Sequence, residues 1–120
     1  MSRKSTGEIG EEIARNLLKK KGYLIREQNF RCSEGEIDII AEKKKNLVFV
    51  EVRTKSTGEF GIPEESITSA KKERLIKTAF SYLAVSKKTP PSWRIDFIGI
   101  ELNGSSKASR IVHIENAVQG

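Results

Sequence analysis

Two acidic residues on neighbouring predicted strands, Asp38 and Glu51, are the residues best placed to do chemistry in this chain. Each lies in a run, residues 36–41 and 48–53, that alternates with the two-residue period of a half-buried strand. The segment between the runs is short, lysine-rich and polar, as expected of a turn. The two runs therefore predict a β-hairpin with its tip at residues 44–45.

The register of this hairpin follows from its apolar side chains, because a slip by one residue would move all of them to the opposite face. One pairing suits both faces. The predicted pairs are Ile37 with Val52, Ile39 with Val50, Ala41 with Val48, Ile40 with Phe49, Glu36 with Arg53, and Asp38 with Glu51. The first three pairs are expected on one face of the sheet and the others on the opposite face.

The opposed carboxylates of Asp38 and Glu51 need a source of positive charge. Directly opposed residues have Cβ atoms about 5 Å apart, and two like charges there are destabilising unless a cation lies between them or one acid is protonated. A divalent metal ion would supply that charge. Alternatively, both acids lie near a wet strand end and tolerate each other. The hairpin by itself favours neither interpretation over the other.

Composition and charge indicate a soluble domain with a polyanionic partner. The 120 residues are 37% hydrophobic and 32% charged, so we expect one domain over residues 1–120. The net charge of +6 makes nucleic acid the leading candidate, although the lysines are spread along the chain and also serve solubility. The single cysteine, Cys32, forms no internal disulfide, and no apolar run approaches the ~20 residues of a membrane span. We expect a cytoplasmic protein without a membrane partner.

Periodicity predicts two helices and five strands. The helices are expected over about residues 7–21, stopped by Gly22, and about 63–85, started by Pro63 and closed by Pro90-Pro91. The strands are expected at about 23–31, 36–41, 48–53, 93–102 and 110–115. The order αβββαββ predicts an α/β domain with a single mixed β-sheet, an antiparallel three-strand start and flanking helices.

Two charged residues lie beside the predicted buried faces of the helices. Glu11 borders the apolar stripe of the first helix, and Lys71 interrupts that of the second, which is Ile67, Ala70, Leu75, Ala79, Tyr82 and Leu83. Either could be an ordinary solvated or snorkelling residue. Alternatively, Glu11 reaches a shared site at the edge of the sheet, and Lys71 places a cation beside the acidic pair.

Motifs along nearly the whole chain resemble those of the YraN-like family of small bacterial proteins. They are Gly10-Glu11-x-x-Ala14, Gly22-Tyr23, Asn29-Phe30-Arg31, Gly35-Glu36-Ile37-Asp38, Phe49-Val50-Glu51-Val52-Arg53, Phe60-Gly61 and Arg94-Ile95-Asp96-Phe97. That family resembles the restriction-endonuclease-like, PD-(D/E)xK nuclease fold and is similar to archaeal Holliday-junction resolvases. The resemblance implies a DNA endonuclease, with branched DNA as a candidate substrate, and it suggests a homodimer.

The resemblance also implies roles for individual residues. Asp38 and Glu51 would bind Mg²⁺ or Mn²⁺ with the main-chain carbonyl of Val52, and Glu11 would contribute from the first helix. Arg53 stands where the nuclease pattern has lysine. Arginine can hold a phosphate, but it cannot act as a general base.

Other cations could complete or replace this machinery. Lys71, or less favourably Lys55, could stand in for the missing lysine, which makes Glu11, Asp38, Glu51, Arg53 and Lys71 the candidate catalytic residues. The candidate nucleic-acid-binding residues are Arg31, Lys55, Lys72 and Arg74. The alternative function is a nucleic-acid-binding protein of the same fold that no longer cuts.

Three residues carry weaker signals. Trp93 could stack on a base, but a lone tryptophan at a strand start more often packs in the fold. His113 is expected to be a strand residue and not a catalytic base, because no partner is evident near it. Asp96 is expected to do no more than pair with a nearby cation.

Overall fold

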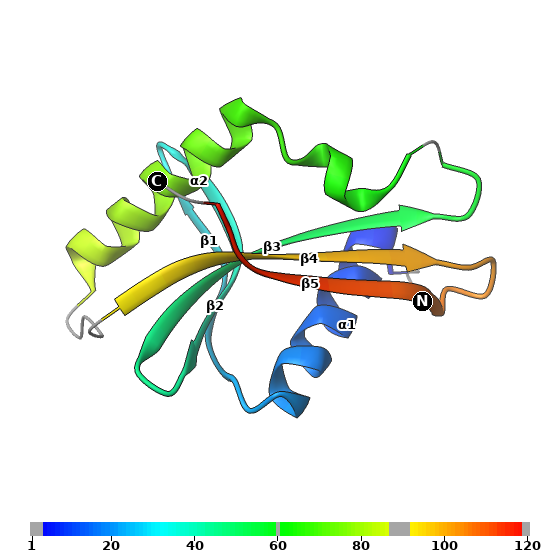
Figure 1. The fold of residues 1–120 in the computed structure, drawn as a ribbon, viewed down its shortest axis with the longest axis horizontal. Coiled ribbons are helices and arrows are strands. Elements are labelled where there is room, and N and C mark those ends of the chain that lie inside the picture. The colour runs from blue at the N-terminus through cyan, green and yellow to red at the C-terminus, as the bar shows by residue number, and fades with distance from the viewer. Residues whose placement is uncertain (1–3, 60, 87–91, 119–120) are drawn as a thin grey trace.

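A mixed five-stranded sheet forms the centre of the protein, and one helix packs on each of its faces (Figure 1). The computed structural model describes residues 4–59, 61–86 and 92–118, so Phe60 and the expected helix stop at Pro90-Pro91 lie outside it. The elements are α1 (Thr6–Lys20), β1 (Leu24–Cys32), β2 (Gly35–Lys43), β3 (Asn46–Ser56), the 3₁₀ helix η1 (Pro63–Ser66), α2 (Ser69–Val85), β4 (Ser92–Leu102) and β5 (Ala108–Val118).

The predicted α/β fold class is confirmed. The strands lie in the order β1-β2-β3-β4-β5, and only β3 and β4 pair in parallel. α2 is the crossover between these two strands, as a parallel connection requires. None of the helices within the described residues is long and apolar enough to cross a membrane.

Alternation along the central strand β3 gives the sheet two buried faces. Val48 and Val50 pack in the layer under α1, whereas Leu47 and Phe49 pack in the layer under α2. The helices close these layers with Ala14 and Leu18 from α1 and with Leu75, Ala79 and Tyr82 from α2. Burial of each large apolar side chain stabilises the fold by about 1.5–3 kcal/mol, so both helices are firmly docked.

The predicted hairpin register is confirmed near the turn, where Ile39, Ile40 and Ala41 pair with Val50, Phe49 and Val48. The predicted ladder pairs of Ile37 with Val52, of Asp38 with Glu51 and of Glu36 with Arg53 are wrong, because the ladder ends at Ile39 and Val50. Ile37 packs in the α2 layer, while Val52 packs in the α1 layer.

A side-chain hydrogen bond lies at the point where β2 and β3 part. Asp38 Oδ2 accepts a hydrogen bond from the Val52 amide, with 2.8 Å between the two atoms. The carboxylate thereby takes a donor that the backbone of β2 would otherwise bind. The two strands separate at this point, and the acids are left at a divided edge of the sheet.

The predicted start of the second helix at Pro63 is wrong. Pro63–Ser66 forms only the short η1, and α2 begins at Ser69 after Thr68, whose side chain accepts a hydrogen bond from the Lys71 amide at 3.2 Å. Proline and acids suit the start of any helix, so the sequence pattern fused two helices. Ala70, expected in the buried stripe, is exposed, and burial along α2 begins at Leu75.

A glycine sets how closely α1 approaches β3. A Cβ atom on the buried Gly10 would lie 1.8 Å from Thr54 Oγ1, well inside any allowed contact. Only a residue without a side chain fits here. Because Glu11 follows directly, this contact also fixes the distance of the Glu11 backbone from the sheet.

Gly10→Ala should therefore destabilise the protein by about 1–3 kcal/mol, since the added methyl group must push α1 away from β3. Gly7→Ala is the matched control: it adds the same group to the same helix where the nearest atom is 3.9 Å away, and it should be neutral or slightly stabilising. Urea unfolding measures both effects. Equal stabilities of the two variants would contradict the close contact.

Candidate active site

A cleft of about 430 Å³ opens where β2 and β3 part, between the first turns of α1 and α2. It brings together most of the residues that the sequence singled out. The lining consists of Gly7 and Glu11 from α1, Gly35, Glu36 and Asp38 from β2, Glu51, Val52, Arg53 and Thr54 from β3, and Lys71, Arg74, Leu75 and Thr78 from α2. All five candidate catalytic residues are in this set.

The carboxyl groups of Asp38 and Glu51 are hydrogen-bonded to each other inside the cleft. Glu51 is only 5% exposed. Burial, together with the hydrogen bond and the charge of Glu51, raises the pKa of Asp38 to about 8. The Val52 amide opposes this effect without cancelling it. The pair therefore shares one proton at neutral pH, which is one of the two ways in which opposed acids can be tolerated.

The other way, a neighbouring cation, is present as well. Lys71 Nζ lies 2.6 Å from Glu51 Oε2, and Arg53 Nη2 lies 3.2 Å from the same atom. The Lys71 side chain is 15% exposed and that of Arg53 is 45% exposed, so Lys71 is the less screened partner. The lysine that interrupts the apolar stripe of α2 thus lies beside the acidic pair.

Glu51 Oε2 nevertheless lacks a hydrogen-bond donor of suitable geometry within the described residues. The contacts of Lys71 and Arg53 with this atom are ion pairs by distance, but their angles do not fit a hydrogen bond. A buried polar atom left in this state costs roughly 1–3 kcal/mol, and in native proteins it calls for a specific explanation. Glu51 is one of the residues that line the cleft.

Glu11 lines the cleft from α1, on the opposite side from Lys71. Burial raises the pKa of Glu11, Arg15 lowers it, and the charges of Glu36, Glu8 and Glu51 raise it again. Its carboxyl group is therefore within electrostatic reach of the acidic pair.

The Val52 amide donates to Asp38, while the role implied for the Val52 carbonyl stays a prediction.

The candidate nucleic-acid-binding residues differ in their distance from the cleft. Arg74 lines it, and Lys72 follows Lys71 in the exposed first turn of α2. Lys55 lies further along β3, 4.0 Å from Glu59.

Arg31 is not among the residues that line the cleft. It lies on β1, where its Nε atom is 3.2 Å from Glu36 Oε2. That ion pair is largely exposed, so it contributes little to stability.

Sequence reasoning missed two residues that shape the cleft, Gly35 and Thr78. A Cβ atom on Gly35 would lie 2.9 Å from Thr78 Oγ1, and that hydroxyl donates to the Arg74 carbonyl at 2.7 Å. Gly35 lies in one of the family motifs, which could have flagged it. Nothing in the sequence pattern marked Thr78, because its position follows only from the docking of α2.

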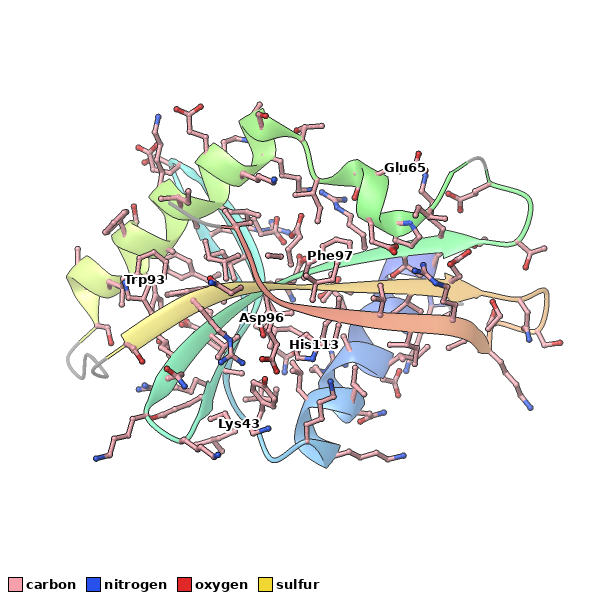
Figure 2. All side chains as sticks on the ribbon, in the orientation of Figure 1. Lys43, Glu65, Trp93, Asp96, Phe97 and His113 are labelled. Carbon is pink, nitrogen blue, oxygen red and sulfur yellow. The ribbon has the colours of Figure 1, made fainter. Side chains whose placement is uncertain are left out.

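A second acid of the sheet, Asp96, offers an internal comparison (Figure 2). It is fully buried and binds Arg94 Nε at 2.9 Å, His113 Nε2 at 2.8 Å and the Asn116 amide at 2.9 Å. Burial raises the pKa of Asp96, but the hydrogen bonds from His113 and Arg94 outweigh it, so the pKa is lowered. The expected pairing of Asp96 with a cation is confirmed.

The expectation that His113 has no partner is wrong. Its Nδ1 atom lies 2.9 Å from Lys21 Nζ, which can only donate, so Nε2 carries the proton donated to Asp96. The partners are Lys21, the C-cap residue of α1, and Asp96 of β4, and local sequence could not reveal them. Trp93, as expected, packs in the fold, against Phe49 and Phe80.

The shared proton makes stability depend on pH. The pKa of Asp38 is about 8 in the folded chain and about 3.9 in the unfolded chain, so between these values the folded state binds more protons. The free energy of unfolding should then decrease as the pH rises from 4 to 8. Asp38→Asn cannot titrate, and it should be more stable than wild type at pH 8 by roughly 1–3 kcal/mol, with a smaller difference at pH 5.

Denaturant unfolding at pH 5, 6.5 and 8 measures this effect. Glu12→Gln, a change at an exposed acid of α1, is the control and should show no trend over this range. A difference between Asp38→Asn and wild type that is constant with pH would contradict the shared proton.

Among solved structures, the chain is similar to SfsA of Pyrococcus furiosus in complex with Ca²⁺. The two share 17% sequence identity with a TM-score of 0.40. The match covers 95% of this chain and 63% of that chain.

Similarity to curated proteins is much stronger. A UPF0102 protein of Caldanaerobacter subterraneus is 41% identical over 118 residues, which cover 98% of this chain and 97% of the relative. One of Dehalococcoides mccartyi is 43% identical over 117 residues, with 98% and 95% covered. Residues 10–100 match the family described as Uncharacterised protein family UPF0102. The chain belongs to this UPF0102 family, which is the YraN-like family that its motifs resemble.

Proposed function

We propose that this protein is a metal-dependent nuclease that hydrolyses phosphodiester bonds of DNA in the cleft between α1 and α2. The observation that carries the proposal is the contact between the carboxyl groups of Asp38 and Glu51. Holding the buried Glu51 in contact with the half-buried Asp38 costs free energy that apolar residues in the same place would not cost. Acids perturbed by burial and by a like charge, inside a cleft, are typical of functional sites.

The donor set fits a hard divalent cation. Mg²⁺ and Mn²⁺ prefer oxygen ligands, and Mg²⁺ is commonly held by one or two carboxylates together with water and substrate phosphate. Asp38 and Glu51 supply two carboxylates, and Glu51 Oε2 has no hydrogen-bond donor within the described residues. No group of three or more His, Cys, Asp or Glu converges in that part of the chain. This agrees with a site that solvent, the Val52 carbonyl and the substrate complete.

When bound, the ion would polarise the phosphate and offset the negative charge that develops on it. The carboxylates would bind it in their ionised form, so Asp38 would release its proton to solvent when the ion binds. Without the ion, Lys71 forms an ion pair with Glu51. With the ion bound to Glu51, Lys71 would be available to bind the phosphate or to donate a proton. Arg53 can hold a phosphate but stays protonated, so the two cations have separate roles.

The cations at the start of α2 also support an anionic ligand. Lys71 and Lys72 lie in its first turn, where the positive end of the helix dipole disfavours a cation by about 0.3–1 kcal/mol, and no acid lies there. Lys72 and Arg74 have no ion-pair partner within the described residues. By contrast, α1 has an acid in its first turn and lysines in its last. A phosphate at the start of α2 would remove this local repulsion.

A second candidate function is nucleic-acid binding without cleavage. Two observations favour it: Arg53 stands at the lysine position of the nuclease pattern, and the proton of Asp38 together with Lys71 already balances the charge of the pair. This function predicts salt-sensitive binding that is indifferent to chelators.

Cleavage separates the two functions. Purified protein with Mg²⁺ or Mn²⁺ should cut branched, flapped or single-stranded DNA, and Asp38→Asn should reduce the rate at least about 100-fold because it removes a carboxylate ligand. Gel analysis of labelled DNA measures this. Glu12→Gln should cut normally. Undiminished cleavage by Asp38→Asn would contradict the assignment of Asp38 as a metal ligand. If the wild-type protein cleaves none of these DNAs, the result would favour a nucleic-acid-binding protein that does not cut.

Binding tests the cations at the start of α2. Arg74→Ala should weaken DNA binding to a similar extent for all sequences and reduce the slope of log K against log salt by about 1, because one phosphate contact is lost. Lys19→Ala is the control. It removes an exposed cation in the last turn of α1 and should leave the slope unchanged. Fluorescence anisotropy in EDTA gives both slopes, and equal effects of the two changes would argue against phosphate binding by Arg74.

A further inference from the structure

We infer that the nucleic acid is single-stranded where it leaves the cleft along α2, and that one of its unpaired bases stacks on Phe80. This inference rests on the proposed function of the cleft and adds the class of substrate. Phe80 is an aromatic side chain that has no part in the proposed cleavage.

Phe80 lies on the surface of α2, where the residue is 57% exposed. The ring is held from below by Trp93, whose centroid lies 5.4 Å away with the rings tilted by 73°. Trp93 packs in turn on the buried Phe49 at 5.7 Å, and Figure 2 shows Trp93 at the start of β4, close to α2. The exposed ring is thus fixed by a column of aromatic contacts and needs little ordering to bind a base.

Phe80 is connected to the cleft by exposed cations. Arg74 lines the cleft, and Lys77 and Phe80 follow at intervals of three residues, so each is a surface neighbour of the one before. At 1.5 Å per residue, Phe80 lies about 9 Å along the helix from Arg74. Cations that follow a backbone, with an aromatic ring for the bases, are the two components of single-strand binding sites.

A duplex fits this surface less well. Its base faces are stacked inside the helix, and an aromatic side chain reaches them only after they are unstacked. Every base of a single strand offers a free face. The arrangement of Arg74, Lys77 and Phe80 therefore selects unpaired nucleotides.

A second copy of the chain is a poorer occupant of the same surface. α2 carries Lys71, Lys72, Arg74 and Lys77 against Glu73 as its one acid. A two-fold contact through the first half of this helix would place this group of cations opposite the same group of the other copy. The charge is complementary to a polyanion and repels the same surface of another subunit.

The test is a titration of wild-type protein with a 5′-labelled 15-nucleotide oligo-dT in EDTA at low salt, followed by anisotropy. Trp93 is the only tryptophan, so its emission gives a second readout next to the stacked base. Phe80→Leu should weaken binding about tenfold, because it keeps an apolar side chain and removes the ring. Phe80→Tyr should bind like wild type, and a 15-base-pair duplex should show no difference between Phe80→Leu and wild type.

Folding of these variants is checked by thermal unfolding, which should show at most a small decrease for Phe80→Leu, because the largely exposed ring loses only its contact with Trp93. Equal affinities of wild type and Phe80→Leu for oligo-dT would overturn the inference. A dimer seen by light scattering and lost in Phe80→Leu would also overturn it, by assigning the ring to a second copy.

The two proposals fail in different ways. The titration contains no metal, so Phe80-dependent binding without cleavage would count against the nuclease and support the stacking site. Cleavage that does not depend on Phe80 would support the nuclease and count against the stacking site.

Discussion

The contact between the carboxyl groups of Asp38 and Glu51 is the interaction on which the site depends. Buried acids can touch only if a proton or a cation balances their charge. Here both are present: the pKa of Asp38 is raised by burial and by Glu51 to about 8, and Lys71 lies 2.6 Å from Glu51. Asp38 also accepts the Val52 amide at the point where the ladder between β2 and β3 ends. The same side chain therefore lies both at the opening of the cleft and in its acidic pair.

Asp96 shows what the same sheet does with an acid that serves the fold. Each aspartate accepts the backbone amide of a neighbouring strand, Val52 for Asp38 and Asn116 for Asp96. Asp96 has Arg94 and His113 as partners, and its pKa is lowered although it is fully buried. Asp38 has another acid as its partner. The difference lies in the neighbours and not in the depth of burial, and it is the main reason to assign chemistry to Asp38.

The two helices divide structural and electrostatic tasks. α1 has a capping box at its start and lysines in its last turn, in agreement with its dipole, and Gly10 docks it tightly on β3. α2 begins with lysines that its dipole disfavours, at the point where it meets the cleft. One helix thus holds the site in place, and the other directs positive charge toward it. This asymmetry is consistent with a ligand that enters along α2.

The sequence by itself determined the order of the main helices and strands, the hairpin register near its turn and the proximity of Asp38 to Glu51, because alternation and turn residues act over a few neighbours. It did not determine that Lys71 meets Glu51, that His113 meets Asp96, or that Ile37 leaves the face of Ile39. Each of these depends on side chains brought together from separate elements. Tertiary structure alone decided which charges are neutralised and which remain in the cleft, since burial and distance, not residue type, set the energy of a charge.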